Sequence, residues 1–266
     1  MPELPEVETI ARNLRPLLEG RCIQSASLLW ERTVAEPGAE EFAERIVGQL
    51  IRSVGRRGKF IVFSLSQDTL LIHLRMSGDL LIEPTCQPPA THHRLLLALD
   101  NGQRLAFNDT RKFGRVWLVS DPQTVLGDLG PEPLDISFTA AQFFQRLHAV
   151  RRQLKPLLLD QCFLAGLGNI YTDEALHLAR LHPLTSAQSV DEAQAACLLQ
   201  AIRDVLEEGI RRNGASIDWV YRGGDFQNYF RVYQRTGQPC PVCGTSVQRI
   251  VVGQRGTHFC PLCQPF

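Results

Sequence analysis

Four cysteines in two C-x2-C pairs near the C-terminus constrain the fold of this 266-residue chain more than any other feature. Cys240 and Cys243 form one pair, Cys260 and Cys263 form the other, and sixteen residues separate the pairs. Each pair makes a tight turn that brings two thiolates to one metal ion, and this spacing is typical of tetrahedral zinc sites. Because four thiolates leave no open position on the metal, the sequence predicts one structural Zn²⁺ ion.

Two redox-active cysteine pairs are the alternative interpretation of the same residues. Such pairs normally occur singly at the start of a helix, whereas here Pro241 and Pro261 stiffen two matched turns. The remaining cysteines are scattered among apolar neighbours, which argues against a disulfide framework: Cys22, Cys86, Cys162 and Cys197.

Hydrophobic periodicity predicts that the first half of the chain is rich in strands. Residues 5–18 have apolar positions at helical spacing and predict one N-terminal helix. From Cys22 to Val119 short apolar runs predict antiparallel strands, and Asp100-Asn101-Gly102 predicts a hairpin between two of them. The predicted strands are 59–65, 69–74, 93–99 and 104–107. Their lengths favour a β-sandwich or barrel.

The pattern becomes helical beyond Gly130-Pro131-Glu132-Pro133. The predicted helices are 139–148, 153–160, 171–180 and 189–212. Residues 214–228 are then expected to form an exposed loop. We expect a two-lobed α+β fold: an N-terminal β-sandwich with flanking helices, then a helical lobe that ends in a zinc-finger β-hairpin. The expected domains are 1–130, 131–228 and 229–266.

The charges favour a polyanionic partner, although the 28 basic and 28 acidic residues cancel. Residues 51–120 carry ten bases and five acids, and residues 201–266 carry eight and five. Residues 1–50 and 121–200 are acidic. Basic segments of this kind suit nucleic acid. With no apolar run long enough to span a membrane and no basic signal peptide, we expect a soluble, intracellular chain.

A basic loop is expected at Thr110-Arg111-Lys112-Phe113-Gly114-Arg115. Such a loop can hold phosphates while its aromatic ring wedges between bases. The alternative is that Phe113 anchors the core beside solvated arginines. A terminal zinc module and the clustered Arg52, Arg56, Arg57 and Lys59 strengthen the nucleic-acid interpretation.

The segment Gly166-Leu167-Gly168-Asn169 precedes a predicted helix. Backbone N–H groups at such a helix start can bind a phosphate. The alternative, which explains the same residues equally well, is a glycine-rich connection to a helix that Asn169 caps.

The N-terminus carries the chemistry that suggests an enzyme. If Met1 is removed, Pro2 presents a secondary amine, and an α-amino group titrates near 8, so a fraction is unprotonated at neutral pH. Such an amine can attack a sugar carbon to form an iminium, with Glu3 alongside as a proton donor. An ordinary Met-Pro-Glu start with no catalytic role is the alternative.

These segments together resemble the formamidopyrimidine-DNA glycosylase family, which is made up of bifunctional base-excision repair enzymes with a helix–two-turns–helix element. The matching segments span nearly the whole chain: MPELPEVE (1–8), RRGKF (56–60), HLRMSG (73–78), FNDTRKFG (107–114), LGPEPL (129–134), GLGNIYTDEAL (166–176), HP (182–183), VYQRTGQPC (232–240) and QRGTHFCPLCQ (254–264). The resemblance implies a monomeric enzyme that acts on double-stranded DNA in the bacterial cytoplasm, at the nucleoid.

The resemblance also implies roles for individual residues. Pro2 would attack C1′ of the damaged nucleotide, Glu3 would pass protons to the opening sugar, and Glu6 would support it. Lys59 would hold the adjacent phosphate and assist β-elimination. Arg255, on the zinc hairpin, would grip the phosphates that flank the lesion and help δ-elimination.

Further implied residues contact the DNA around the extruded nucleotide. Met76, Arg111 and Phe113 would fill the gap that the lesion leaves. The implied phosphate contacts are His73, His92, Arg151 and Asn169.

The implied substrates are oxidised purines, such as 8-oxoguanine and formamidopyrimidines, with strand cleavage by β,δ-elimination. The segment between Ser216 and Phe226-Gln227 is shorter than its counterpart in the purine-specific branch, which leaves the lesion preference open. The alternatives are an endonuclease VIII-like enzyme for oxidised pyrimidines and a zinc-ribbon protein that binds damaged DNA without cutting it.

Overall fold

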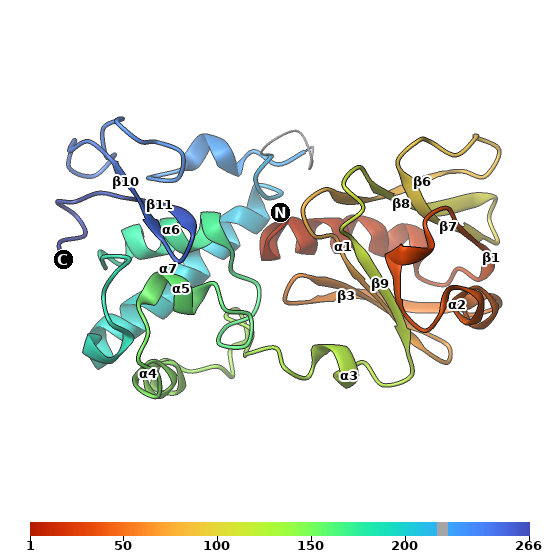
Figure 1. Cartoon of the computed structure of the whole chain (residues 1–266), viewed down its shortest axis with the longest axis horizontal. Coiled ribbons are helices and arrows are strands. Elements are labelled where there is room, and N and C mark those ends of the chain that lie inside the picture. Colours follow the sequence, from red (N-terminus) through yellow and green to blue (C-terminus); the bar gives the residue numbers. More distant parts are fainter. Residues whose placement is uncertain (217–222) are drawn as a thin grey trace. The chain divides into compact units, whose positions relative to one another are not determined.

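The computed structural model describes residues 1–216 and 223–266, which form two compact units (Figure 1). Unit 1 comprises Met1–Gly127 together with Ser216–Gly223, and unit 2 comprises Asp128–Ala215 together with Gly224–Phe266. In the described part of the chain, no helix is both long enough and apolar enough to cross a membrane.

Unit 1 is built mainly from strands, as the sequence predicts. Its helical segments are α1 (Leu4–Leu18), the 3-10 turn η1 (Glu31–Thr33), α2 (Ala39–Ile46) and α3 (Gln123–Leu126). Its strands are β1 (Ile23–Leu28), β2 (Val34–Glu36), β3 (Ile51–Arg57), β4 (Phe60–Leu65), β5 (Thr69–His73), β6 (Gly78–Pro84), β7 (His93–Leu99), β8 (Gln103–Asp109) and β9 (Arg115–Val119). Among the described residues they form one sheet of order β1-β7-β8-β6 and another of order β2-β9-β5-β4-β3.

The predicted hairpin at 100–102 is confirmed. Strands β7 and β8 pair antiparallel with Leu97 opposite Leu105, and Gly102 adopts a φ of +78°. The Asn101 side chain accepts a hydrogen bond from the Gln103 N–H at 3.1 Å, which closes the turn.

Two features of unit 1 differ from the sequence expectation. Strand β2 pairs parallel with β9, so the sheets are not purely antiparallel. Helix α2 interrupts the strand region, where only strands were expected. It was missed because its eight residues bury only Phe42 and Ile46, a single i, i+4 pair that is too short a pattern to distinguish from a strand.

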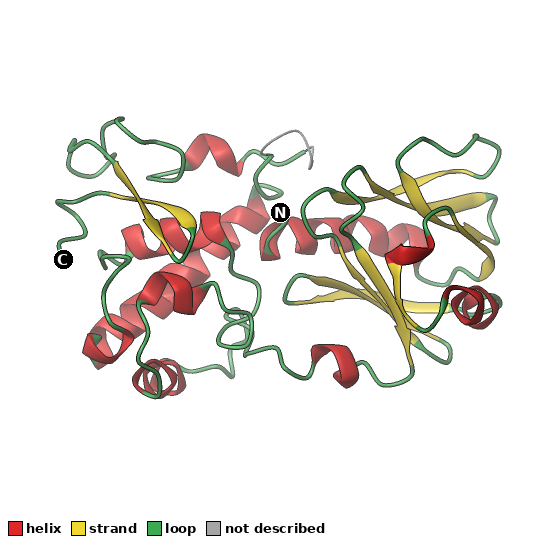
Figure 2. Ribbon diagram, viewed as in Figure 1, coloured by secondary structure: helices red, strands yellow, loops and turns green. Residues whose placement is uncertain are grey.

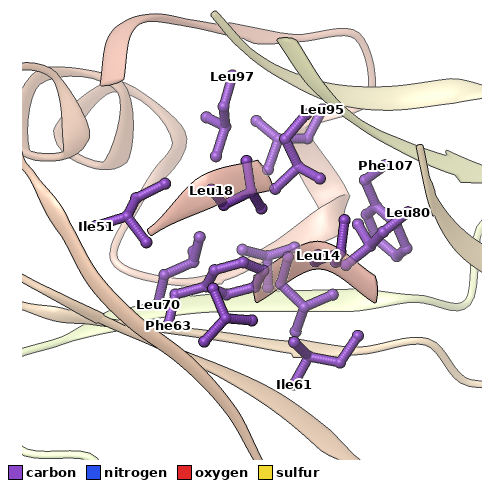
Figure 3. Close-up of a cluster of buried hydrophobic side chains, with 14 of the residues drawn as sticks. Leu14, Leu18, Ile51, Ile61, Phe63, Leu70, Leu80, Leu95, Leu97 and Phe107 are labelled. Atoms are coloured by element: carbon purple, nitrogen blue, oxygen red, sulfur yellow. The ribbon is translucent and has the colours of Figure 1, made fainter. Parts of the chain in front are cut away.

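One hydrophobic core unites both sheets of unit 1 with α1 and α2. In Figure 3, Leu14 and Leu18 of α1 lie among side chains such as Phe63, Leu95 and Phe107 from the two sheets. Burying each large apolar side chain contributes about 1.5–3 kcal/mol. The core therefore fixes α1, and with it the N-terminal residues, against the sandwich.

Unit 2 is helical and ends in a hairpin (Figure 2). Its elements are α4 (Ala140–His148), α5 (Leu154–Leu158), α6 (Asn169–Leu178), η2 (Ala187–Ser189), α7 (Glu192–Arg211), η3 (Phe226–Tyr229), β10 (Gln248–Val252) and β11 (Arg255–Phe259). Strands β10 and β11 pair antiparallel, so the predicted C-terminal hairpin is confirmed.

The segment 214–228, which was expected to be an exposed loop, is partly buried. Phe226 is fully buried and stacks on Tyr171 of α6, with ring centroids 5.1 Å apart. Residues 217–222 make up most of the segment between Ser216 and Phe226 for which the family resemblance indicates a shortened loop, and they lie outside the described residues.

Candidate functional site

The start of α1 places the first candidate residues. Pro2 and Glu3 precede the helix, and Glu3 occupies the N-cap position. A capping box joins Glu3 to Glu6, whose carboxylate accepts a hydrogen bond from the Glu3 backbone N–H at 2.7 Å. This arrangement fixes the backbone directly after Pro2. It also means that the Glu6 carboxylate caps the start of α1.

Lys59 lies in the turn between β3 and β4, and an ion pair links this turn to α1. Arg56 Nε lies 3.0 Å from Glu8 Oε2, and Arg56 also donates to the Gly58 carbonyl at 3.1 Å. Burial alone would raise the pKa of Glu8, but hydrogen bonds from Arg12 and Arg56 hold it below its usual value. Glu8 is therefore ionised at neutral pH, and the chain of contacts ties the Lys59 turn to the second turn of α1.

His73 is a buried, neutral imidazole at the end of β5. Burial, together with the positive charges of Arg75 and Lys59, lowers its pKa to about 3. Its Nδ1 accepts a hydrogen bond from the Arg75 N–H at 3.0 Å, so the proton of the neutral ring is on Nε2. If His73 contacts a phosphate, it does so as a neutral N–H donor.

Met76 lies in the loop after β5, and Arg111 and Phe113 lie in the loop after β8. The buried carboxylate of Asp109 holds these two loops together. Asp109, at the end of β8, accepts hydrogen bonds from the Ser77 hydroxyl, from the Arg111 N–H at 3.1 Å and from the Gly114 N–H at 2.7 Å. Asp109 is 1% exposed. Its carboxylate therefore sets the loop after β5 and the loop after β8 in one fixed arrangement.

The three side chains on these loops are accessible. Met76 and Phe113 are 42% and 50% exposed, high values for apolar side chains. The Arg111 guanidinium lies 5.0 Å from the centroid of the Phe113 ring, in cation–π range. The prediction that Phe113 could be a core anchor is wrong, because half of it faces solvent.

His92 lies exposed just before β7. Its backbone carbonyl accepts a hydrogen bond from the Asp109 N–H at 2.8 Å, and its ring Nδ1 lies 3.5 Å from the Arg94 guanidinium. This brings His92 next to the end of β8 that bears Asp109.

In unit 2, helix α6 presents a polar face at residues 169, 173 and 177, which are spaced i, i+4, i+8. Asn169 donates from its side-chain amide to the Gly256 carbonyl at 3.0 Å. Asp173 accepts a hydrogen bond from the His258 backbone N–H at 2.9 Å. The helix start is therefore bound to the zinc hairpin, and the N-cap is Gly168, so the expectation that Asn169 caps the helix is wrong.

Arg255 is exposed at the tip of this hairpin. Gly253 and Gln254 both have positive φ, 54° and 61°, which matches the two-residue turn that joins tightly paired strands. Because Gly256 and His258 are held by α6, the position of Arg255 relative to Asn169 is fixed. Arg151 is exposed in the connection between α4 and α5.

The four cysteines predicted to bind zinc come together in unit 2. Their sulfur atoms all lie within 4.8 Å of one another, with Cys240 to Cys263 at 3.9 Å and Cys243 to Cys260 at 3.4 Å. Zn–S bonds of about 2.3 Å place tetrahedral sulfurs about 3.8 Å apart. The site therefore fits one structural Zn²⁺ ion with four thiolate ligands, as the sequence predicts.

Sequence reasoning missed several residues that position these groups. Ser77 and Asp109 lie inside the matched motifs but were given no role, and Asp173 and His177 were likewise overlooked. The available signal was the run Asn169–Leu178, in which Asn169, Asp173 and His177 recur every four positions and so share one face of a helix.

Comparisons with known proteins identify the class of enzyme. Residues 1–116 match the family model described as formamidopyrimidine-DNA glycosylase N-terminal domain, and residues 129–220 match the H2TH domain of the same enzymes. Residues 237–265 match a zinc finger found in FPG and IleRS.

Full-length relatives and solved structures agree. The formamidopyrimidine-DNA glycosylases of Chloroflexus aurantiacus and Protochlamydia amoebophila are 48% and 44% identical to this chain, over 99% of it and 98% and 99% of their own lengths. A structure of MutM in complex with DNA containing carbocyclic 8-oxo-G is 38% identical, with a TM-score of 0.92. Wild-type Lactococcus lactis Fpg in complex with DNA containing N7-benzyl-Fapy-dG is 36% identical, with a TM-score of 0.93. Both matches to structures cover 100% of each chain.

The fold, the zinc module and these matches define a base-excision repair DNA glycosylase. The chain belongs to the formamidopyrimidine-DNA glycosylase family, whose members combine glycosylase and AP-lyase activity.

Proposed function

We propose that this enzyme excises oxidised purines, namely 8-oxoguanine and formamidopyrimidines, from double-stranded DNA and cleaves the strand by β,δ-elimination. One observation carries the proposal. Solved structures that match at least 99% of the chain at 36–38% identity are complexes with DNA containing carbocyclic 8-oxo-G, Fapy-dG or an abasic site. We further propose that the enzyme acts as a monomer in the bacterial cytoplasm, at the nucleoid.

The proposed nucleophile is Pro2. After Met1 is removed, the Pro2 nitrogen attacks C1′ of the extruded nucleotide, the glycosidic bond breaks and the base departs. Glu3 protonates the ring oxygen as the sugar opens, which leaves an iminium between Pro2 and C1′. The capping box supports these roles, because it holds the Glu3 backbone at the start of helix α1, which is anchored in the core.

Strand cleavage follows from the iminium as an electron sink. Loss of a proton from C2′ expels the 3′ phosphate, and a second elimination expels the 5′ phosphate. Lys59 holds the phosphate next to the reacting sugar and assists the first step, and Arg255 assists the second. The Glu8–Arg56–Gly58 contacts support the role of Lys59, since they fix its turn relative to α1.

The remaining candidates contact DNA. Met76, Arg111 and Phe113 fill the gap left by the extruded nucleotide, which suits their exposure on loops braced by Asp109. The proposed phosphate contacts are His73, His92, Arg151 and Asn169.

Borohydride trapping on a duplex with an abasic site tests the nucleophile. The wild-type enzyme should form a covalent adduct that maps to the N-terminal peptide and whose yield falls strongly in Pro2→Gly. The exposed Pro89→Gly variant is the matched control and should trap normally. An adduct at another residue, or an undiminished yield in Pro2→Gly, contradicts the assignment.

Excision from matched duplexes tests the substrate. The enzyme should release 8-oxoguanine and formamidopyrimidine opposite cytosine much faster than thymine glycol opposite adenine. The reverse order would favour an endonuclease VIII-like preference for oxidised pyrimidines, and binding without excision of any lesion would favour a non-catalytic protein.

A further inference from the structure

We propose that His177 is a positioning residue for the zinc site. Its imidazole Nε2 donates a hydrogen bond to the thiolate of Cys240. His177 lies near the end of α6, is 2% exposed, and its Nε2 is 3.3 Å from Cys240 Sγ. This inference is independent of the proposed DNA chemistry and depends only on zinc occupying the four cysteines.

The direction of this hydrogen bond follows from the chemistry of the two partners. A zinc-bound thiolate carries no hydrogen and can only accept, so the imidazole must donate. Among the described residues none offers a hydrogen-bond partner to His177 Nδ1, which is buried. A proton on Nδ1 would leave a buried N–H unpaired and would point the Nε2 lone pair at a negative sulfur, both of which are unfavourable.

Among the residues that the structure describes, the other hydrogen bonds to these sulfurs come from inside the zinc module. Cys240 Sγ also accepts from the Val242 N–H at 3.5 Å, and Cys260 Sγ accepts from the Cys263 N–H at 3.4 Å. These are backbone amides of the knuckles themselves. His177 is different, because it brings a donor from α6, a separate element of unit 2, to a zinc ligand.

This contact has two physical consequences. A hydrogen bond to a zinc-bound thiolate withdraws negative charge from the sulfur, which makes it a poorer nucleophile and slows its oxidation and release. The contact also completes the polar face of α6, whose residues 169, 173 and 177 bind residues 256, 258 and 240 of the zinc module. Helix α6 thus holds the module at both the hairpin tip and the metal.

Zinc release from the purified holoenzyme tests the role with matched variants. His177→Phe keeps an aromatic ring but removes the donor, and His177→Gln restores an N–H near the position of Nε2. Removing a partner of this kind typically costs about 10–100-fold in metal affinity. We expect His177→Phe to bind zinc at least about tenfold more weakly in competition with a chromophoric chelator, and to lose zinc faster under hydrogen peroxide. His177→Gln should recover part of that loss.

His182→Phe is the control. His182 packs edge-on against Phe259 at 4.7 Å between ring centroids, so it also contacts the zinc module. Its ring Nδ1 accepts a hydrogen bond from the Leu184 N–H at 3.2 Å, a contact that involves no cysteine sulfur. It should retain wild-type affinity. Equal zinc release from wild type and His177→Phe, or equal losses in His177→Phe and His182→Phe, would overturn the proposal.

Two spectroscopic measurements complement zinc release, and the first needs only the wild-type protein. Long-range ¹H–¹⁵N spectra of the zinc-loaded protein should show a proton on His177 Nε2, whereas a proton on Nδ1 alone would overturn the proposal. In the Co²⁺-substituted protein, the thiolate-to-metal charge-transfer band should shift between wild type and His177→Phe, which lacks the donor. An unmoved band would assign His177 a packing role only.

Discussion

The carboxylate of Asp173 lies between the ammonium of Lys155, 2.5 Å away, and the backbone N–H of His258, 2.9 Å away. Asp173 and Lys155 are both fully buried, and Lys155 also donates to the Asn169 carbonyl at 3.1 Å. One carboxylate therefore connects α5, the start of α6 and strand β11. Arg255 lies three residues before His258 on that strand, so the geometry of the proposed phosphate contact depends on this buried ion pair.

Asp173→Ala should destabilise the protein by about 3–5 kcal/mol, because it leaves the Lys155 charge buried without its partner. The double variant Asp173→Leu/Lys155→Met removes both charges and should cost much less. Urea unfolding at pH 7 measures both.

Arg152→Ala is the control for the Asp173 prediction. Arg152 pairs with Asp160 at 2.6 Å, but its side chain is 43% exposed, so its loss should cost no more than about 1 kcal/mol. If Asp173→Ala cost no more than Arg152→Ala, the buried pair would not hold the hairpin.

Lys59→Ala and Arg255→Ala should each weaken binding to abasic-site duplex by a similar factor for different sequences. Each phosphate contact that is lost should reduce the slope of log K against log salt by about 0.9. Fluorescence anisotropy at several salt concentrations measures the slope.

Arg211→Ala is the matched control for the salt dependence, because Arg211 is 70% exposed on α7 and pairs with Glu208. The slope of log K against log salt for Arg211→Ala should equal that of wild type. If Lys59→Ala or Arg255→Ala also gave the wild-type slope, that residue would not contact a phosphate.

The long elements of the fold could be predicted from the sequence because their apolar residues repeat regularly. The helix expected at 189–212 is observed as Glu192–Arg211, and the strand expected at 93–99 is observed with the same bounds. Short elements such as β2 were missed, since three residues give no periodicity, and the pairing of β2 with β9 joins segments about 80 residues apart.

The zinc ligands were predictable for a different reason. The spacing of four cysteines in two C-x2-C pairs is by itself typical of a tetrahedral zinc site. The structure brings the four sulfur atoms together. The residues that support the site carry no such local signal. Asp109 is a single aspartate in a loop motif, and only the folded chain shows that it accepts hydrogen bonds from Ser77, Arg111 and Gly114.

Asp109→Ala should loosen both loops that carry the proposed gap-filling side chains. Hydrogen bonds to a buried carboxylate are worth about 1.5–3 kcal/mol each in net stability, so local opening should become easier by at least about 2 kcal/mol. Hydrogen exchange at the Arg111 and Gly114 amides should accelerate accordingly, and excision of 8-oxoguanine should fall more than binding to an abasic-site analogue. Unchanged exchange at both amides would show that Asp109 does not brace the loops.

Acid should weaken the link between α1 and the Lys59 turn. The pKa of Glu8 is lowered in the folded protein, so its ion pair stabilises the fold fully above the unfolded pKa near 4.5 and loses that contribution as the pH falls through the lower folded value. Glu8→Gln should therefore be less stable than wild type by about 1–2 kcal/mol at pH 7. The difference should shrink as the pH drops below about 4.5.

Glu41→Gln is the control for this pH dependence. Its carboxylate also pairs with an arginine, Arg45, but the Glu41 side chain is 58% exposed, so its effect should be below about 1 kcal/mol at neutral pH. Urea unfolding between pH 3 and pH 7 compares the variants. A Glu8→Gln difference that stays constant over this range would contradict the ion-pair interpretation.

Removing zinc should unfold the hairpin module and spare unit 1. The buried apolar cluster of the module consists of Val232 and Val247 together with the cysteines themselves, so few apolar side chains remain to hold it once the metal leaves. Unit 1 has a large separate core built from both of its sheets. After chelation, hydrogen exchange should become fast at the amides of Thr257 and Phe259 on β11 and stay slow at that of Leu97 on β7. Protection of β11 that survived complete zinc removal would mean that the contacts from α6, above all Asp173 to His258, suffice to fold the hairpin without the metal.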